Sequence, residues 1–274
     1  MKKRILFVSQ EIKPFLPETE ISKTCRELPQ ITQDSGKEIR IFMPRYGIVN
    51  ERRHQLHEVI RLSGMNLVVD DKDHPLIIKV ASIPQARMQV YFIDNEEFFK
   101  RKGFLTDDKG KLFNDSDERA IFFAKGVLET VKKLGWKPDI IHCHGWMASL
   151  LPLYLKKMYA DDAHFMDSKV VVSIYNQGFT GTFDKKFKDK LAFDGFSEEE
   201  INVVSEPDYN HLMCLAANNS DGIVRMGENL NDDLQQCIEK ASVPVLENPK
   251  DKDESKAYSS FYDSLLEKKA VITS

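Results

Sequence analysis

The stretch that decides the fold runs from RILFVS (residues 4–9) to EIRIFM (residues 38–43). Between these two short, largely apolar runs, residues 21–34 have helical character, which Pro29 is expected to interrupt and Gly36 to end. Short apolar runs of this kind are typical of parallel strands that are covered on both faces. The stretch therefore predicts a strand–helix–strand unit of a doubly wound α/β sheet.

The same alternation continues along the chain to residue 246. Asp115, with Glu118 three residues later, is expected to cap one helix, and Pro152 to displace or kink the next. Residues 56–94 differ, because they hold three strand-like runs separated by polar residues, which indicates a meander. The predicted fold class is α/β, a single Rossmann-like, doubly wound and mostly parallel sheet with a β-meander at its edge.

The alternation favours one domain over residues 1–246 rather than two smaller ones. Residues 247–257 are rich in charged side chains, so we expect a solvated linker there. Residues 258–274 include an amphipathic segment, which we expect to form a helix that packs back on the domain.

Composition narrows the class of protein. The 274 residues include 42% hydrophobic and 30% charged ones, with a net charge of −4 and scattered basic residues, which argues against a nucleic-acid partner. No apolar run reaches the roughly 20 residues that span a membrane. Four cysteines without metal-type spacing favour reduced thiols in a cytoplasmic protein and predict no metal site. The turn at residues 9–15 lacks glycine, so no dinucleotide cofactor is expected.

Candidate binding residues follow the expected strands, at the carboxyl edge where doubly wound sheets bind ligands. They are Arg45, Tyr46, His144, Trp146 and Asn176. An indole can stack on a sugar ring, and guanidinium, imidazole and amide groups can hydrogen bond to sugar hydroxyls. Each residue also has a structural alternative: a salt-bridged Arg45, packed rings for Tyr46 and Trp146, a hydrogen-bonded His144 and a turn-stabilising Asn176.

Longer motifs occur in a fixed order through residues 4–180. They are Pro14-Phe15, Met43-Pro44-Arg45-Tyr46-Gly47, Val90 to Phe99, Asp117 to Phe123, His142-Cys143-His144-Gly145-Trp146 and Ser173-Ile174-Tyr175-Asn176. These motifs resemble those of the N-terminal half of bacterial glycogen/starch synthases, two-domain GT-B enzymes that transfer glucose from ADP-glucose to an α-1,4-glucan. The resemblance implies an α-glucan or maltooligosaccharide as ligand. It also implies that the family's C-terminal domain is missing, because too few residues follow residue 245.

The chain departs from the family at positions that handle the substrate. The family's Lys-x-Gly-Gly-Leu loop falls on Pro17, Glu18, Thr19, Glu20 and Ile21. A diphosphate at a helix N-terminus is favoured by free N–H groups, glycines and an ammonium, whereas a proline and two carboxylates disfavour it. Tyr175 stands at the position of a family histidine at the reaction centre, and a phenol with a pKa of about 10 is a different acid or base from imidazole. Gly145 and Met147 likewise replace an aspartate and a histidine.

Three functions follow from these matches and departures. The first is a degenerate, non-catalytic domain that binds glucan or regulates other proteins, which the side-chain chemistry favours. The second is an active glycosyltransferase whose donor domain is supplied by a partner chain. The third is a structural or interaction module, in which the cleft surface serves as a homodimer interface.

Overall fold

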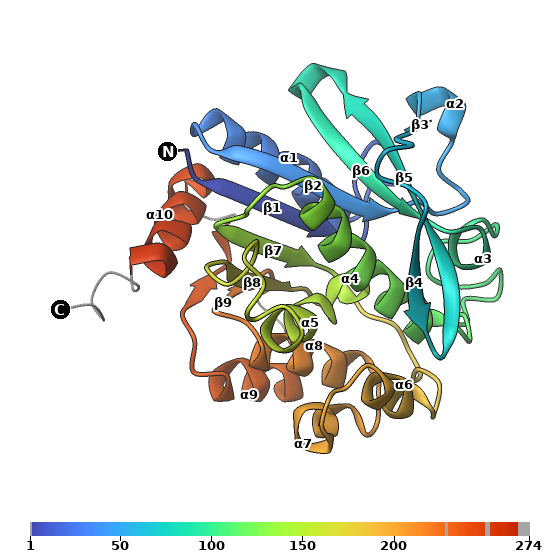
Figure 1. Cartoon of the computed structure of the whole chain (residues 1–274). Coiled ribbons are helices and arrows are strands. Elements are labelled where there is room, and N and C mark those ends of the chain that lie inside the picture. The colour runs from blue at the N-terminus through green and yellow to red at the C-terminus, as the bar shows by residue number, and fades with distance from the viewer. Residues whose placement is uncertain (1, 228–229, 250–252, 268–274) are drawn as a thin grey trace.

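The computed structural model describes residues 2–227, 230–249 and 253–267, which build one ten-stranded sheet with helices on both faces (Figure 1). The strands are β1 (Arg4–Ser9), β2 (Glu38–Pro44), β3 (His57–Glu58), β4 (Met65–Val69), β5 (Lys72–Ile83), β6 (Met88–Asp94), β7 (Ile140–His144), β8 (Lys169–Ile174), β9 (Gly222–Arg225) and β10 (Val245–Glu247). The helices are α1 (Glu20–Asp34), α2 (Glu51–His54), α3 (Glu96–Phe99), α4 (Ser116–Lys133), α5 (Leu151–Lys157), α6 (Phe187–Phe193), α7 (Glu198–Ile201), α8 (Tyr209–Asn218), α9 (Asp232–Lys240) and α10 (Glu254–Glu267), with 3-10 turns at Pro84–Ala86, Trp146–Ala148 and Asn202–Val204.

The strand order is β10-β9-β8-β7-β1-β2-β6-β5-β3, with β4 paired to β5 outside this path. Neighbouring strands from β10 to β6 are parallel, whereas β5 runs antiparallel to β6, β4 and β3. The predicted fold class is therefore confirmed: the sheet is mostly parallel, and β4, β5 and β6 form the meander at its edge.

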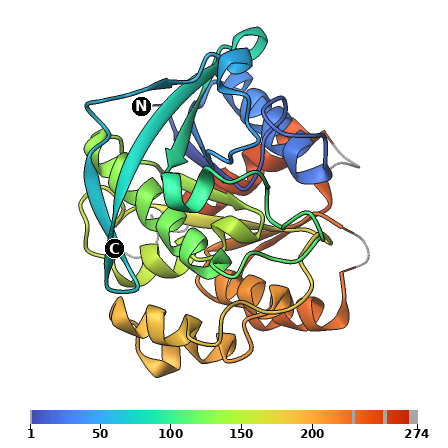
Figure 2. The same ribbon diagram turned by 90° about the vertical axis from the view of Figure 1, so that its right-hand side faces the viewer.

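The direction of each crossover decides which face of the sheet its helix covers, because such crossovers are right-handed. The step from β1 to β2 places α1 on one face, here named the α1 face. The steps from β6 to β7 and onward to β10 run the opposite way and place α4, α5, α8 and α9 on the other face, the α4 face (Figures 1 and 2). Helix α1 alone cannot cover β7, β8 and β9 on its own face.

Helix α10 completes the cover of the α1 face. It packs beside α1 and against β9 and β10, and its Phe261, Tyr262 and Leu265 are buried. Gly222 of β9 makes this approach possible: a Cβ there would lie 2.9 Å from Cζ of Phe261 and 3.0 Å from a methyl carbon of Leu265.

Two expectations about helices are wrong. Pro29 does not interrupt α1, which is continuous from Glu20 to Asp34 with Pro29 buried inside it. Tertiary burial of an amphipathic face outweighs the loss of one backbone hydrogen bond. Asp115 stands at the N-cap position of α4 but accepts no capping bond, because its carboxylate pairs with Arg101 instead. Pro152 lies in the first turn of α5, which does displace the start of that helix.

The segment expected to be a linker, residues 247–257, is shorter in the structure. Glu247 belongs to β10, and α10 begins at Glu254 rather than at residue 258. Residues 250–252 of this segment, and residues 268–274 of the expected C-terminal helix, lie outside the described residues. The first turn of α10 carries charged residues because it faces water. A solvated helix start and a solvated linker have the same charged composition, so the sequence alone did not tell them apart.

The expectation of four reduced cysteines is also corrected. Cys214 of α8 and Cys237 of α9 are joined as a disulfide, whereas Cys25 and Cys143 are free and buried. The two half-cystines are 23 residues apart in sequence, but the packing of α8 against α9 brings their Cα atoms to 5.7 Å. The spacing of the two cysteines in the sequence does not predict that α8 and α9 bring them together.

We expect Gly222→Ala to loosen α10, because the added methyl group must push Phe261 and Leu265 away from β9. Overpacking of this kind costs about 1–3 kcal/mol. Urea unfolding and limited proteolysis at the start of α10 would measure the change. The matched control is Gly227→Ala, whose Cβ would meet its nearest atom, Cβ of Asn176, at an ordinary 3.7 Å. Equal midpoints for the two variants would contradict this account of α10.

Candidate functional site

The loops that leave the carboxyl ends of β1, β2, β6, β7 and β8 meet along one edge of the sheet. The sequence-predicted residues lie on these loops or, for His144, at the end of β7. Four of the five, namely Arg45, Tyr46, His144 and Trp146, are buried, and only Asn176 is exposed. The structure therefore places these residues at the predicted edge of the sheet, but their side chains do not share one open surface.

Arg45 is held in a network of charges. Its Nε lies 3.0 Å from Asp94 and 3.2 Å from Glu51, and Lys79 contacts the same two carboxylates at 3.1 and 2.7 Å. Only 8% of Arg45 is exposed. Each of the two cations therefore has carboxylate partners already, and the network fixes the loop that follows β2 to β5 and β6.

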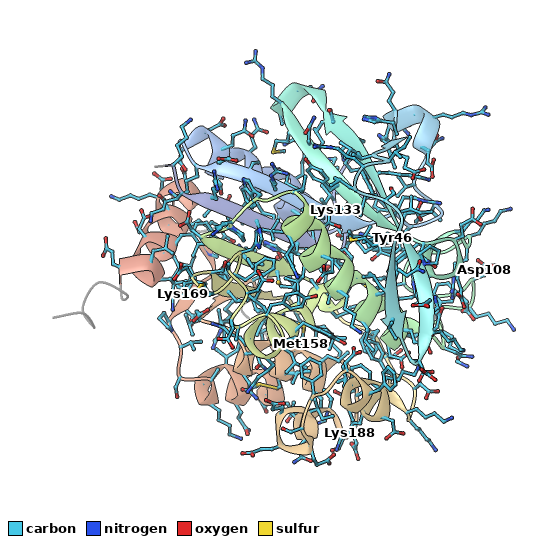
Figure 3. The ribbon with its side chains drawn as sticks, viewed as in Figure 1. Tyr46, Asp108, Lys133, Met158, Lys169 and Lys188 are labelled. Atoms are coloured by element: carbon cyan, nitrogen blue, oxygen red, sulfur yellow. A yellow bond between two sulfur atoms is a disulfide. The ribbon has the colours of Figure 1, made fainter. Side chains whose placement is uncertain are left out.

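Tyr46 lies inside the molecule (Figure 3). The ring of Tyr46 packs edge-on against Phe99 and Phe104. The guanidinium of Arg119 lies 5.5 Å from the Tyr46 ring centre and donates to the Phe104 carbonyl at 3.0 Å. Burial lowers the pKa of Arg119 to about 10. The phenol oxygen of Tyr46 and two nitrogens of Arg119 have no hydrogen-bond partner among the described residues.

Sequence reasoning did not select Arg119. Arg119 lies within the Asp117 to Phe123 motif and is 0% exposed. Burial of a charged guanidinium carries a large desolvation cost, which marks Arg119 as a candidate functional residue. The signal in the sequence is an arginine within the apolar face of α4, where a helix that packs on a sheet normally carries aliphatic or aromatic side chains.

Histidines of β7 form a buried pair on the α1 face, with His142 and His144 both 0% exposed and their ring centres 4.0 Å apart. His142 is hydrogen bonded through Nδ1 to the Tyr262 hydroxyl of α10 and through Nε2 to Ser173, each at 2.8 Å. His144 Nδ1 lies 2.9 Å from the Tyr175 hydroxyl. Burial lowers the pKa of His142 well below its usual value and that of His144 to about 3, so both rings are neutral.

The structure brings the Tyr175 hydroxyl to His144. Burial raises the pKa of its phenol well above the usual value, so the hydroxyl stays protonated at neutral pH. Its backbone carbonyl accepts a 2.6 Å bond from the Tyr209 hydroxyl, which ties the end of β8 to α8. In this position Tyr175 can donate a hydrogen bond but cannot act as a base.

Trp146 packs edge-on against two phenylalanines of the loop after β8. The ring centres are 5.1 Å from Phe179 and 5.6 Å from Phe183, and these two rings stack on each other at 5.3 Å. The indole is 1% exposed, so the aromatic surface nearest to solvent here belongs to Phe179 rather than to Trp146.

A groove of about 650 Å³ opens above this aromatic cluster. It is lined by residues 111–114 and by residues 180–186. Asn114, Thr180 and Thr182 are exposed and supply amide and hydroxyl groups, while the half-buried Phe113 and the buried Phe183 supply apolar walls. Sequence reasoning missed these residues, because they lie on two irregular loops whose proximity no motif predicts.

Helix α1 begins within the Pro17 to Ile21 loop, and its N-terminus is occupied by the chain itself. Thr19 and Ser22 form a reciprocal capping box, with the Ser22 N–H donating to Thr19 at 3.0 Å and the Thr19 N–H donating to Ser22 at 2.8 Å. Thr19 also hydrogen bonds to Glu11, whose pKa is nevertheless raised by burial. Glu18 forms an ion pair with Lys13.

Comparisons with known proteins agree with this geometry. The family described as "Starch synthase catalytic domain" matches residues 4–239. The chain belongs to this starch synthase family. The glycogen synthase of Chlorobium limicola is 43% identical over 189 residues, which cover 69% of this chain and 39% of that protein. The glycogen synthase of Pelodictyon phaeoclathratiforme is 42% identical over 208 residues, covering 73% of this chain and 42% of that protein.

Among solved structures, the catalytic domain of starch synthase IV from Arabidopsis thaliana, bound to ADP and acarbose, superimposes with a TM-score of 0.74. The match covers 91% of this chain and 53% of that one at 17% sequence identity, and so it concerns the fold, which is the Rossmann-like half of a GT-B protein. The chain thus spans about two fifths of the length of the glycogen synthases it matches (39% and 42%).

Against the starch synthase pattern, the replacement of an aspartate by Gly145 is now explained. Gly145 has a φ of +81°, and a Cβ there would lie 2.7 Å from the Cβ of Gln10. The Gln10 side chain reaches this space and accepts a 3.3 Å bond from the Met147 N–H. An aspartate at residue 145 would therefore require the Gln10 side chain to move.

Two further observations concern the described residues as a whole. None of the described helices combines the length and the apolar character needed to cross a membrane. Within the described ranges, no three His, Cys, Asp or Glu side chains gather closely enough to hold a metal ion.

The buried histidines predict acid instability. Above pH 6.5, His144 is neutral in both the folded and the unfolded chain; below it, only the unfolded chain takes up the proton, because the folded pKa is about 3. The free energy of unfolding should therefore fall with pH, by about 2 kcal/mol between pH 6.5 and pH 5 from His144 alone.

Urea unfolding of the native protein and of His144→Asn at several pH values tests this prediction. The variant should be less stable overall but should lose less stability between pH 6.5 and pH 5. The control His57→Asn changes an exposed histidine and should retain the full pH dependence. A pH dependence that is identical in all three proteins would show that His144 is not the titrating group.

Proposed function

We propose that this domain of the starch synthase family binds α-1,4-glucan chains without handling ADP-glucose, and that it acts as a non-catalytic or regulatory homologue. The observation that carries the proposal is the closed N-terminus of α1. Thr19 and Ser22 use backbone N–H groups that a phosphate would need, and Glu18 and Glu20 add negative charge beside them. A diphosphate would have to displace the capping box and overcome this repulsion.

The reaction centre supports the same proposal. Tyr175 takes the place of the family's histidine, and its buried, protonated phenol is hydrogen bonded to His144. Neutral, buried His144 does not substitute for that histidine, because it is 0% exposed and lies on the α1 face under α10 and α1. Neither Tyr175 nor His144 therefore supplies an acid or base at the position of the family's histidine.

The groove above Phe183 supports the glucan part of the proposal. Its volume of about 650 Å³ suits a short oligosaccharide, and it offers hydroxyl and amide groups next to aromatic walls. The Arabidopsis relative was solved with acarbose, a carbohydrate, in addition to ADP. We place the glucan in this groove, with Asn114, Thr180 and Thr182 hydrogen bonding to sugar hydroxyls. The cytoplasmic location inferred from the sequence is part of this proposal.

Calorimetric titration with maltoheptaose should give saturable binding, whereas titration with ADP-glucose should give none. The double variant Asn114→Ala/Thr182→Ala should weaken maltoheptaose binding about tenfold, because two exposed hydrogen-bonding groups are lost. Asn66→Ala, an exposed asparagine on β4, is the control and should bind as the native protein does. Saturable binding of ADP-glucose to the native protein would overturn the proposal. Absence of measurable binding with both ligands would favour an interaction module instead.

Restoring the loop tests the donor side directly. The triple variant Pro17→Lys/Thr19→Gly/Glu20→Gly supplies an ammonium and free N–H groups, and should gain measurable ADP-glucose binding. The control Pro17→Ala/Thr19→Ala/Glu20→Ala removes the same side chains without supplying either group, and should gain much less. Loss of the Thr19 cap costs about 1 kcal/mol, so both variants should remain folded by circular dichroism. Equal gains in the two variants would show that this loop does not exclude the donor.

A further inference from the structure

The opposite edge of the sheet, where the parallel strands begin, holds a cavity of about 600 Å³. Its lining includes Lys2 before β1, Lys37 just before β2, Arg40 near the start of β2, and Arg87 just before β6. In the part of the chain that the structure describes, none of these four cations forms an ion pair with a carboxylate. In a protein whose net charge is −4, such a cluster is not explained by the overall charge.

The acidic side chain in this lining, Glu38, is already engaged. It accepts a 2.6 Å bond from the indole N–H of Trp136 and lies 3.3 Å from Nε of Arg4. The Trp136 bond and the nearby arginines lower the pKa of Glu38, so it is ionised, and Arg4 offsets its charge. Among the described residues, Lys2, Lys37 and Arg87 therefore have no carboxylate in ion-pair contact, and Arg40 only shares the charge of Glu38 with Arg4.

Arg40 is oriented before any ligand arrives. Its guanidinium carbon lies 5.7 Å from the Tyr91 ring centre and 5.1 Å from that of Trp136, and Nη1 donates to the Tyr91 hydroxyl at 3.3 Å. Aromatic contacts hold the planar fork in place while its other N–H groups stay available, which suits a phosphate group. Lys37 is similarly fixed, because its ammonium donates to Ser259 of α10 at 2.6 Å.

We propose that this amino-edge cavity binds a small anion that carries two phosphate groups. Four like charges in one cavity repel each other, and a single phosphate would leave part of this charge uncompensated. Gln33 in the last turn of α1 also lines the cavity, and the C-terminus of this helix contributes partial negative charge on that side. The ligand therefore lies toward Arg40 and Arg87, over β2 and β6.

This site is separate from the glucan groove and from the α1 N-terminus. Those two features lie at the carboxyl ends of the parallel strands, whereas Lys2, Lys37 and Arg87 lie at their amino ends. The proposal does not depend on the proposed glucan binding. It would make the domain responsive to phosphorylated compounds through a surface that the sugar does not touch.

Calorimetric titration with inorganic pyrophosphate, at constant ionic strength, tests the proposal. We expect saturable binding that Arg40→Gln and, separately, Arg87→Gln weaken at least about tenfold, because each removes a charge-assisted hydrogen bond. Arg52→Gln removes the same charge from α2 and should bind within about twofold of the native protein. Arg87 is exposed, so its variant should stay folded even where Arg40→Gln does not.

A second pair of titrations identifies the kind of ligand. A sugar bisphosphate that binds more tightly than pyrophosphate would show that the cavity recognises a phosphorylated sugar, and the reverse order would show that it recognises a free diphosphate; either result supports the proposal. Sulfate that binds as tightly as pyrophosphate, absence of saturable binding, or equal weakening by Arg52→Gln would overturn it.

Discussion

Right-handed crossovers impose the constraint on which the rest of this structure depends. They send α4, α5, α8 and α9 to one face of the sheet and leave α1 alone on the other, so β7, β8 and β9 need a cover from elsewhere. Helix α10 supplies it, and the absence of a side chain at Gly222 sets how closely it can approach. The C-terminal segment is therefore part of the hydrophobic core, and not an appendage attached by a linker.

Covering that face has a chemical consequence. The strands beneath α1 and α10 carry His142, His144 and Ser173, and a buried polar group without a partner costs about 1–3 kcal/mol. The Tyr262 hydroxyl of α10 satisfies one nitrogen of His142, and Ser173 satisfies the other. The same cover makes His144 and Tyr175 unavailable to a ligand. His142 thus contributes directly to the packing of α10 through its hydrogen bond to Tyr262.

The sequence predicted the sheet and its helices well because hydrophobic periodicity reports local structure directly. Prediction from the sequence failed where a local preference, such as proline breaking a helix or aspartate capping one, competed with long-range packing. Pro29 stays inside α1 because burial of that helix compensates for it, and Asp115 gives up its cap to pair with Arg101. The structure does place the predicted candidate residues at the carboxyl edge of the sheet, since residues that follow parallel strands must meet there. Which of those side chains face solvent was not predictable, because the loops at residues 111–114 and 180–186 meet only in the folded chain.

The two edges of the sheet differ in how their charges are treated, and this difference bears on function. At the carboxyl edge, Arg45 and Lys79 are neutralised by Asp94 and Glu51, and the N-terminus of α1 is capped by Thr19 and Ser22. An anion at those points would compete with carboxylates for Arg45 and Lys79 and with the Thr19 side chain for the Ser22 N–H. At the amino edge, Arg40 is held by aromatic rings with no carboxylate paired to it among the described residues. This difference in how the cations are paired is why we propose phosphate binding at the amino edge of the sheet and not at the carboxyl edge.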